Sequence, residues 1–189
     1  RGHTCVALDS GAVYCWGDNG SGAVTGSVTG SDLAPTLIAG ASGAISVAAG
    51  DLHSCALITD RTVRCWGANA SGQLGQGNYM TPRPPMLVSG VGDAIRLAAG
   101  AMHTCVVRAD GRGACFGDNV ALQLADTLGR SRSNTAGDVQ GETVLSRIAL
   151  GTGHSCARRA GGAVVCWGTA LLGDGSSTVS TTPVLVTLP

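Results

Sequence analysis

The sequence predicts an all-β protein built from β-propeller blades, and three observations support this fold class. Eight cysteines form four pairs with the same spacing, namely Cys5/Cys15, Cys55/Cys65, Cys105/Cys115 and Cys156/Cys166. Each pair lies in a frame that opens with His-Ser/Thr-Cys, and this frame recurs after 50, 50 and 51 residues. A fixed period of about this length is typical of one structural unit copied along a chain. Short runs of Ala, Val and Leu, split by Gly and Ser, are typical of buried strands.

We expect residues 1–189 to form a single repeat domain, with units at about 1–44, 45–94, 95–145 and 146–189. Each unit offers about four short strands and one long polar loop, which fits a propeller blade. In the second unit, a leading strand at 45–50 is followed by two strands at 53–57 and 63–67. The short gap between the last two predicts a hairpin.

The hairpin loops end in Gly in three of the four units, at Gly11, Gly111 and Gly162. Glycine accepts the left-handed conformation that a three-residue hairpin loop requires. Arg61 stands at this place in the second unit. We therefore expect the second hairpin to turn differently or to carry backbone strain.

The two cysteines of each unit lie symmetrically about the hairpin loop. Cys5 and Cys15 are each five residues from Ser10, so strand pairing places them opposite one another. Opposed residues of a non-hydrogen-bonded pair have Cα atoms about 4.5 Å apart, at the edge of disulfide reach. We expect four disulfides within hairpins, each contributing roughly 2 to 3 kcal/mol by the chain-entropy relation.

Both faces of the hairpin carry apolar or small side chains. Period-two alternation puts His3, Cys5 and Ala7 on one face and Val6 and Leu8 on the other, so the hairpin should pack between neighbouring sheets. Tryptophans of the Cys-Trp-Gly motif are expected to fill the wedge between sheets. The repeated histidine is expected to hydrogen-bond the backbone of a turn or of the neighbouring blade.

A polar, glycine-rich stretch follows each Trp-Gly and leads into a short strand of edge character. In the second unit, the prolines at 82, 84 and 85 precede Met86-Leu87-Val88, and the first and fourth units carry prolines at 35 and 183. The third unit departs from the pattern, because Phe116 replaces Trp and no proline follows the loop.

These motifs closely resemble the regulator-of-chromosome-condensation repeat. The second unit matches best, through His53, Cys55, Leu57, Val63, Trp66, Gly67, Asn69, Gly72, Gln73, Leu74 and Gly75. The resemblance implies a β-propeller, most often of seven blades in this family, and the cysteine-paired form is similar to secreted bacterial proteins. Relatives include a nucleotide exchange factor for a small GTPase and a secreted inhibitor of β-lactamases. With four frames, the chain is expected to belong to a larger propeller or to one completed by oligomerisation.

Charge and hydropathy argue against two classes of protein. The formal net charge is zero, so the basic excess of a nucleic-acid-binding protein is missing. No apolar run reaches the roughly 18 to 20 residues that span a bilayer. Residues 1–60 hold five Asp and one Arg, whereas arginines gather late in the chain, and this asymmetry favours head-to-tail contacts.

The cysteines and histidines admit other interpretations. Zinc sites usually combine Cys-x2–4-Cys knuckles into four ligands, but each unit offers three ligands at most, so we expect no metal. A His beside a Ser suggests a catalytic pair, yet adjacent strand residues point to opposite faces and the triplet occurs four times. The Gly-Gln-Leu-Gly loop lacks the Lys-Ser/Thr of a phosphate-binding loop. We expect neither enzyme activity nor a cofactor.

The sequence predicts a secreted or cell-surface protein-interaction scaffold, because disulfides persist in extracellular, cell-surface or periplasmic settings. The absence of Lys beside abundant Gly, Ala and Arg indicates a GC-rich genome and hence a bacterial origin. The candidate contact surface consists of the loops at 18–34, 68–84, 118–138 and 169–182, where Tyr79, Met80, Arg83, Arg130 and Arg132 are the expected anchors of a protein partner. The alternatives are an inhibitor like the β-lactamase-binding relative, a structural subunit of a surface assembly, and a GTPase exchange factor. Exposed blade edges also offer a route to self-association.

Overall fold

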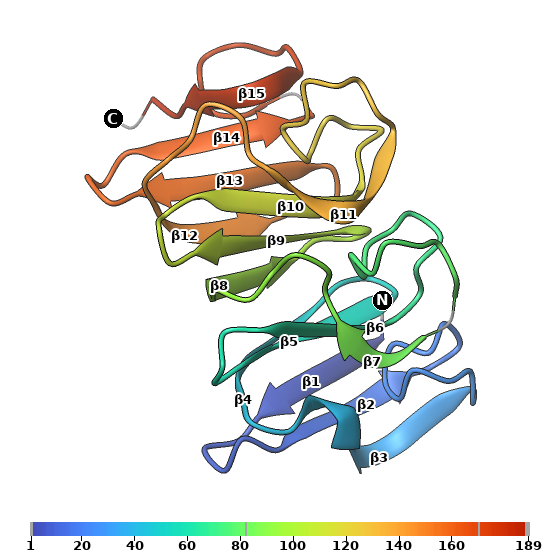
Figure 1. Ribbon diagram of the computed structural model, residues 1–189. Helices are drawn as coiled ribbons and strands as arrows, with labels where there is room; N and C mark the ends of the chain where they lie inside the picture. Colours follow the sequence, from blue (N-terminus) through green and yellow to red (C-terminus); the bar gives the residue numbers. More distant parts are fainter. Residues whose placement is uncertain (1, 82, 170, 188–189) are drawn as a thin grey trace.

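The computed structural model describes residues 2–81, 83–169 and 171–187, which form four antiparallel sheets arranged in chain order (Figure 1). Blade 1 comprises β1 (His3–Ala7), β2 (Val13–Asp18) and β3 (Ser31–Leu37). Blade 2 comprises β4 (Ala44–Ala49), β5 (His53–Ile58), β6 (Val63–Gly67) and β7 (Arg83–Leu87). Blade 3 comprises β8 (Ala94–Ala99), β9 (His103–Arg108), β10 (Gly113–Asp118) and β11 (Arg132–Asp138). Blade 4 comprises β12 (Leu145–Leu150), β13 (His154–Arg159), β14 (Val164–Gly168) and β15 (Ser180–Leu185). The all-β prediction is confirmed.

Blades 2, 3 and 4 each have four strands in sequence order, whereas blade 1 has three. The leading strands contact one another from blade to blade, since β8 lies against both β4 and β12. β1 corresponds to β5, because both open with the histidine of the frame. Among the described residues, blade 1 therefore has no counterpart of β4, and the expectation of four strands holds for three of the four units.

The hairpin loop of blade 2 makes the same turn as the others despite its arginine. Arg61 has a φ of 67°, close to the values of 80°, 86° and 98° at Gly11, Gly111 and Gly162. The Arg61 amide donates to the carbonyl of Ile58, as the amide of Gly11 does to Leu8. Arg61 thus carries the expected strain, since a side chain disfavours the left-handed region.

The four predicted disulfides are all present, and each joins cysteines that lie directly opposite one another on the two strands of a hairpin. The bonds are Cys5–Cys15, Cys55–Cys65, Cys105–Cys115 and Cys156–Cys166. Their Cα atoms are 4.0 to 4.1 Å apart. Each bridge therefore clamps one hairpin and links no two blades.

The disulfide of blade 4 differs from those of blades 2 and 3 in its surroundings. Cys55, Cys65, Cys105 and Cys115 are all buried, whereas Cys156 is only half-buried. Its partner Cys166 is buried on β14, where it pairs with Cys156 on one side and with Val184 of β15 on the other. The bond is thus reached by solvent from the side of Cys156, on β13.

The apolar core consists of three clusters, each shared by two consecutive blades. The cluster between blades 2 and 3 contains Cys55 and Leu57 from one blade and Val106, Ala114 and Phe116 from the next. The other two clusters join blade 1 to blade 2 and blade 3 to blade 4. Stability accordingly comes from contacts between neighbours, as in other repeat proteins.

The outermost strands β3, β7 and β15 contain the prolines that the sequence placed near an edge strand, except Pro82, which lies outside the described residues. One short 3₁₀ turn, η1 (Ala39–Ala41), is the helical element of the described chain. Within the described ranges, no helix is long and apolar enough to cross a membrane.

Candidate functional site

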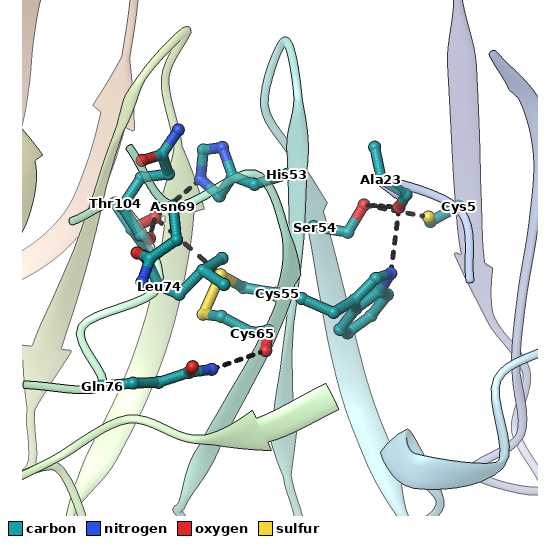
Figure 2. The surroundings of a disulfide bond; sticks show 12 residues. Cys5, Ala23, His53, Ser54, Cys55, Cys65, Asn69, Leu74, Gln76 and Thr104 are labelled. Atoms are coloured by element: carbon teal, nitrogen blue, oxygen red, sulfur yellow. Dashed lines mark hydrogen bonds between the residues drawn. A yellow bond between two sulfur atoms is a disulfide. The ribbon is translucent and has the colours of Figure 1, made fainter. Parts of the chain in front are cut away.

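A chain of hydrogen bonds links each histidine of the first three frames to the next blade. The Nε2 atom of His53 lies 2.8 Å from the hydroxyl of Thr104 (Figure 2). This hydroxyl in turn donates to the carbonyl of Gln73 at 2.9 Å. The same arrangement joins His3 to Ser54 and His103 to Ser155, both at 2.9 Å. Because each hydroxyl gives its hydrogen to a carbonyl, Nε2 of the histidine must be the donor to the hydroxyl.

Burial keeps the histidines of blades 2 and 3 neutral. Desolvation, together with repulsion from neighbouring histidines, lowers the pKa of His53 to about 3 and that of His103 to about 4. Their Nδ1 atoms are buried without a hydrogen-bond partner. A ring that stays neutral far below pH 7 is a poor general base. The structural role expected for the histidine is therefore supported, but its direct partner is a hydroxyl of the next blade and not a backbone group.

The tryptophans pack between blades as expected. Trp66 and Trp167 are fully buried, and the indole of Trp66 donates to the carbonyl of Ala23 at 2.9 Å. Phe116 occupies the same buried position in blade 3, where it offers no N–H. Trp16 is only half-buried, because no blade precedes blade 1 in the described chain. The frame residues are thus committed to packing between blades.

A buried asparagine shapes the long loop of each of the first three blades. The side-chain oxygen of Asn69 accepts a hydrogen bond from the amide of Leu74 at 3.1 Å, and its amide group donates to the carbonyl of Asn78 at 2.9 Å. Asn19 and Asn119 accept the equivalent bonds in blades 1 and 3. Sequence reasoning missed this role, although the fixed place of the asparagine two residues after the Gly of the frame was a signal for it.

Two of the predicted binding residues meet between the loops of blades 2 and 3. The guanidinium of Arg132 lies 4.3 Å from the centre of the Tyr79 ring, a cation–π contact. Arg132 also donates to the carbonyl of Ala70 at 2.7 Å. This contact fixes the two loops to each other while leaving 39% of Tyr79 exposed.

Met80 and Arg83 extend this surface, whereas Arg130 lies apart from it. The side chain of Met80 is 61% exposed, and its sulfur lies 3.9 Å from a guanidinium nitrogen of Arg83. We call Tyr79, Met80, Arg83 and Arg132 the loop patch. Arg130 instead forms an ion pair with Asp126 at 2.6 Å within the loop of blade 3.

A pocket of about 520 Å³ opens beside Arg130. Two residues that differ between blades 2 and 3 explain why the pocket opens in blade 3. In blade 2, Gln76 donates to the carbonyl of Cys65 at 3.0 Å, whereas the corresponding Asp126 turns to Arg130. Met86 pairs with Cys65 in blade 2, but Gly137 takes that place opposite Cys115 in blade 3. Sequence reasoning did not identify Asp126 and Gly137 as residues that shape this pocket.

All eight cysteines, from Cys5 in blade 1 to Cys166 in blade 4, are engaged in disulfides. Their thiols therefore neither ligate a metal nor act as nucleophiles. Within the described residues, no three or more His, Cys, Asp or Glu side chains are grouped to hold a metal ion. The loops are the part of the described chain in which a functional surface can be sought.

Comparisons with known proteins agree with this architecture. Two family models of the regulator of chromosome condensation (RCC1) repeat match, one over residues 1–23 and 44–73 and the other over residues 62–107. No curated protein sequence matches. Among solved structures, human WBSCR16 is similar at a TM-score of 0.87 and 26% identity, covering 98% of this chain and 50% of that protein.

Prp20p of Saccharomyces cerevisiae, the yeast RCC1, is similar in two structures. The first has a TM-score of 0.85 at 19% identity and covers 100% of this chain and 49% of Prp20p. The second, with Kap60 bound, has a TM-score of 0.84 at 19% identity and covers 100% of this chain and 47% of Prp20p. Such low identity shows a shared fold alone, and the chain spans about half the length of these relatives. The repeat frame, the family-model matches over parts of residues 1–107 and the shared blade architecture support RCC1-type repeats in this chain.

Proposed function

We propose that this chain is a protein-binding scaffold without catalytic activity, and that it engages its partner through the loop patch. The Tyr79–Arg132 contact carries the proposal, because it presents an aromatic ring and an arginine on two loops held together. Aromatic and arginine side chains on a rigid framework are the usual anchors of protein interfaces. Exposed Met80 adds an adaptable apolar contact beside them.

The disulfides support a location outside the reducing cytoplasm. Every blade carries one, and cytosolic thiols are normally kept reduced. We therefore place the protein in an extracellular, cell-surface or periplasmic setting, and the bacterial origin expected from composition belongs to the same proposal.

The relatives support a protein as the partner. Prp20p has been described with its binding properties to Gsp1p and histones, and it has been crystallised with Kap60. The proposed lack of catalytic activity is supported by the roles of the repeated His and Ser/Thr side chains, which bond to neighbouring blades. The interpretation as an inhibitor like the β-lactamase-binding relative is one form of this scaffold, and an inhibition assay against purified β-lactamases tests it.

A binding comparison tests the loop patch. Wild-type protein and the double variant Tyr79→Ala/Arg132→Ala are each immobilised and exposed to extracellular and envelope proteins of the source cells, and bound proteins are identified by mass spectrometry. Arg112→Ala is the matched control, because Arg112 lies in the hairpin loop at the other end of the blade 3 strands and its side chain is 52% exposed. We expect a partner that wild type and the control retain and the double variant loses. Identical bound proteins for all three would refute the patch as the binding surface.

A GTPase exchange factor is the second candidate, favoured by the fold shared with Prp20p and its binding to Gsp1p. This activity belongs to a cytosolic setting, where four disulfides do not persist. Eight free thiols in protein isolated from its native compartment, together with accelerated release of nucleotide from a small GTPase, would favour this candidate over the extracellular scaffold.

A further inference from the structure

The pocket of about 520 Å³ in blade 3 belongs to a single blade and contains no residue of the loop patch. Its lining runs from Cys115 of β10 to Gln140, which follows β11. Blades 2 and 4, which flank blade 3, are both part of the described chain. The pocket is therefore left open by the residues of blade 3 themselves, and its volume lies in the usual range for a small-ligand site.

One side of the pocket is apolar and is uncovered because Gly137 carries no side chain. In blade 2, Met86 lies opposite Cys65, whereas Gly137 lies opposite Cys115 in blade 3. A Cβ at Gly137 would have no neighbour from elsewhere in the chain closer than 3.8 Å, so packing does not require a glycine here. The space that a side chain like that of Met86 occupies in blade 2 is thus open in blade 3. The apolar side chains around it are those of Cys115, Leu124, Leu128 and Ala136.

The other side of the pocket carries a guanidinium that a largely buried carboxylate holds in place. The side chain of Asp126 is 10% exposed, and one of its oxygens accepts from Nε of Arg130 at 2.6 Å. The other oxygen accepts from the amide of Leu128 at 2.8 Å. Both oxygens are engaged within the loop, so Asp126 positions the arginine and leaves no oxygen free of a partner for a cationic ligand.

Arg130 keeps its two terminal nitrogens for a ligand. Among the described residues, the bond from Nε to Asp126 is the one hydrogen bond that this guanidinium makes. Its Nη2 atom would lie 3.8 Å from a Cβ at Gly137, so the free end of the guanidinium lies beside the open space. Two N–H groups in a fixed plane match the two oxygens of a carboxylate.

Asp138 is the second acidic residue of the lining, and arginines offset its charge. One of its carboxylate oxygens lies 3.4 Å from a guanidinium nitrogen of Arg112, and the other lies 3.9 Å from one of Arg108. Like Asp126, Asp138 is therefore paired with a cation. An anion that enters the pocket meets no unpaired carboxylate among the lining residues.

We propose that this pocket binds an aliphatic carboxylate, supplied either by a free organic acid or by the C-terminus of a peptide. The carboxylate pairs with the two terminal nitrogens of Arg130, and the aliphatic chain lies in the space beside Gly137, against Cys115. The charged pair orients the ligand, and burial of the chain adds affinity in proportion to its apolar area. A ligand that lacks either part loses one of these two contributions.

Titration of isotope-labelled protein with pentanoate, followed by NMR chemical shifts, tests the pocket. Pentanoate joins a carboxylate to an unbranched tail similar in length to the side chain of Met86. We expect saturable shifts centred on residues 124–140. Acetate lacks the tail and pentanol lacks the charge, so each should bind at least about tenfold more weakly.

A peptide distinguishes the two sources of the carboxylate. The peptide acetyl-Ala-Ala-Leu is titrated with a free C-terminus and as its C-terminal amide. Tighter binding of the free-acid peptide than of pentanoate, with no binding of the amide, identifies a chain terminus as the ligand. Tighter binding of pentanoate identifies a free organic acid.

Two variants remove the two parts of the site separately. Gly137→Met installs the residue of blade 2, so it should fill the open space and weaken pentanoate binding at least about tenfold. Arg130→Gln removes the cation and should weaken binding by a similar factor. Arg96→Gln is the control that should bind like wild type, because Arg96 is exposed on β8, at the opposite edge of blade 3.

Thermal unfolding under oxidising conditions checks that each variant is folded. A wild type without saturable shifts overturns the proposal, and so does equal binding of pentanoate and pentanol. Pentanoate binding that neither Gly137→Met nor Arg130→Gln weakens would show that the acid binds elsewhere and would equally refute the site.

Discussion

Blades 2 and 3 carry the same hairpin and differ at specific places in the loop and outer strand that follow it. Both have a buried histidine bonded to a hydroxyl of the next blade, and both have a disulfide between opposed cysteines. Beyond the hairpin, Gln76 and Met86 of blade 2 give way to Asp126 and Gly137 in blade 3. The comparison teaches that the repeat preserves the groups that pack between blades, while the loops and outer strands diverge.

The largest effect is expected at the buried aromatic position. Trp66→Ala should destabilise the protein by about 3 to 5 kcal/mol, because it leaves a large cavity between blades 1 and 2. Trp66→Phe makes blade 2 resemble blade 3 and should cost only about 1 kcal/mol, through loss of the hydrogen bond to Ala23. Urea unfolding measures both values, and equal losses for the two variants would contradict the packing role.

Removal of a disulfide should come next. The double variants Cys55→Ala/Cys65→Ala and Cys105→Ala/Cys115→Ala each open a bridge of sequence separation 10, so each should lose about 2 to 4 kcal/mol. Urea unfolding of the two variants should give similar losses, because the clamp is the same in both blades. A loss in one blade only would show that the hairpins are not equivalent.

Acid should weaken both blades through their histidines. The unfolded chain protonates these rings near an ordinary pKa of about 6.5, whereas burial lowers the pKa of His53 to about 3 and of His103 to about 4. The stability that the neutral rings contribute is therefore fully present above about pH 6.5 and falls as the pH drops to about 4 for His103 and about 3 for His53.

The free energy of unfolding, measured by urea titration at several pH values below about 6.5, checks the acid prediction. The variant His53→Gln/His103→Gln is the control and should show a shallower dependence on pH. An equal slope for this variant and the wild type would show that other groups cause the acid sensitivity.

The smallest effect is expected in the loop of blade 3. Asp126→Gln installs the residue of blade 2, which loses the ion pair with Arg130 and gains an amide able to bond the Cys115 carbonyl. The net change in stability should be within about 1 kcal/mol, because the Arg130 side chain is 45% exposed and the new amide offsets part of the loss. Urea unfolding measures it, and a loss of several kcal/mol would show that the ion pair holds the loop together.

The blades and their disulfides could be predicted because the signals were local. The symmetric spacing of Cys5 and Cys15 about one loop settles which strands pair and which residues face each other. The same spacing predicted the bond from Cys156 to Cys166 at the other end of the chain. For Arg61, the glycines at the matching places left two outcomes, a different turn or backbone strain, and the left-handed conformation is the second of these. Each of these features depends on one hairpin alone.

Features that join two blades were harder to predict. The hydroxyl partner of His53 lies in Thr104, 51 residues away, and nothing local in the sequence sets the register of one blade against the next. The Tyr79–Arg132 contact was missed as a pair for the same reason, although both residues were expected in the binding surface. Asp126 and Gly137 become informative only when the units are superposed as structures.

Disulfide mapping by mass spectrometry, on protein isolated without reductant from its native compartment, tests the central claim most directly. The account predicts four linked peptides, each joining two cysteines ten residues apart within one blade, and no free thiol. Free thiols would contradict the extracellular or periplasmic setting, and links between blades would contradict the self-contained hairpin clamp.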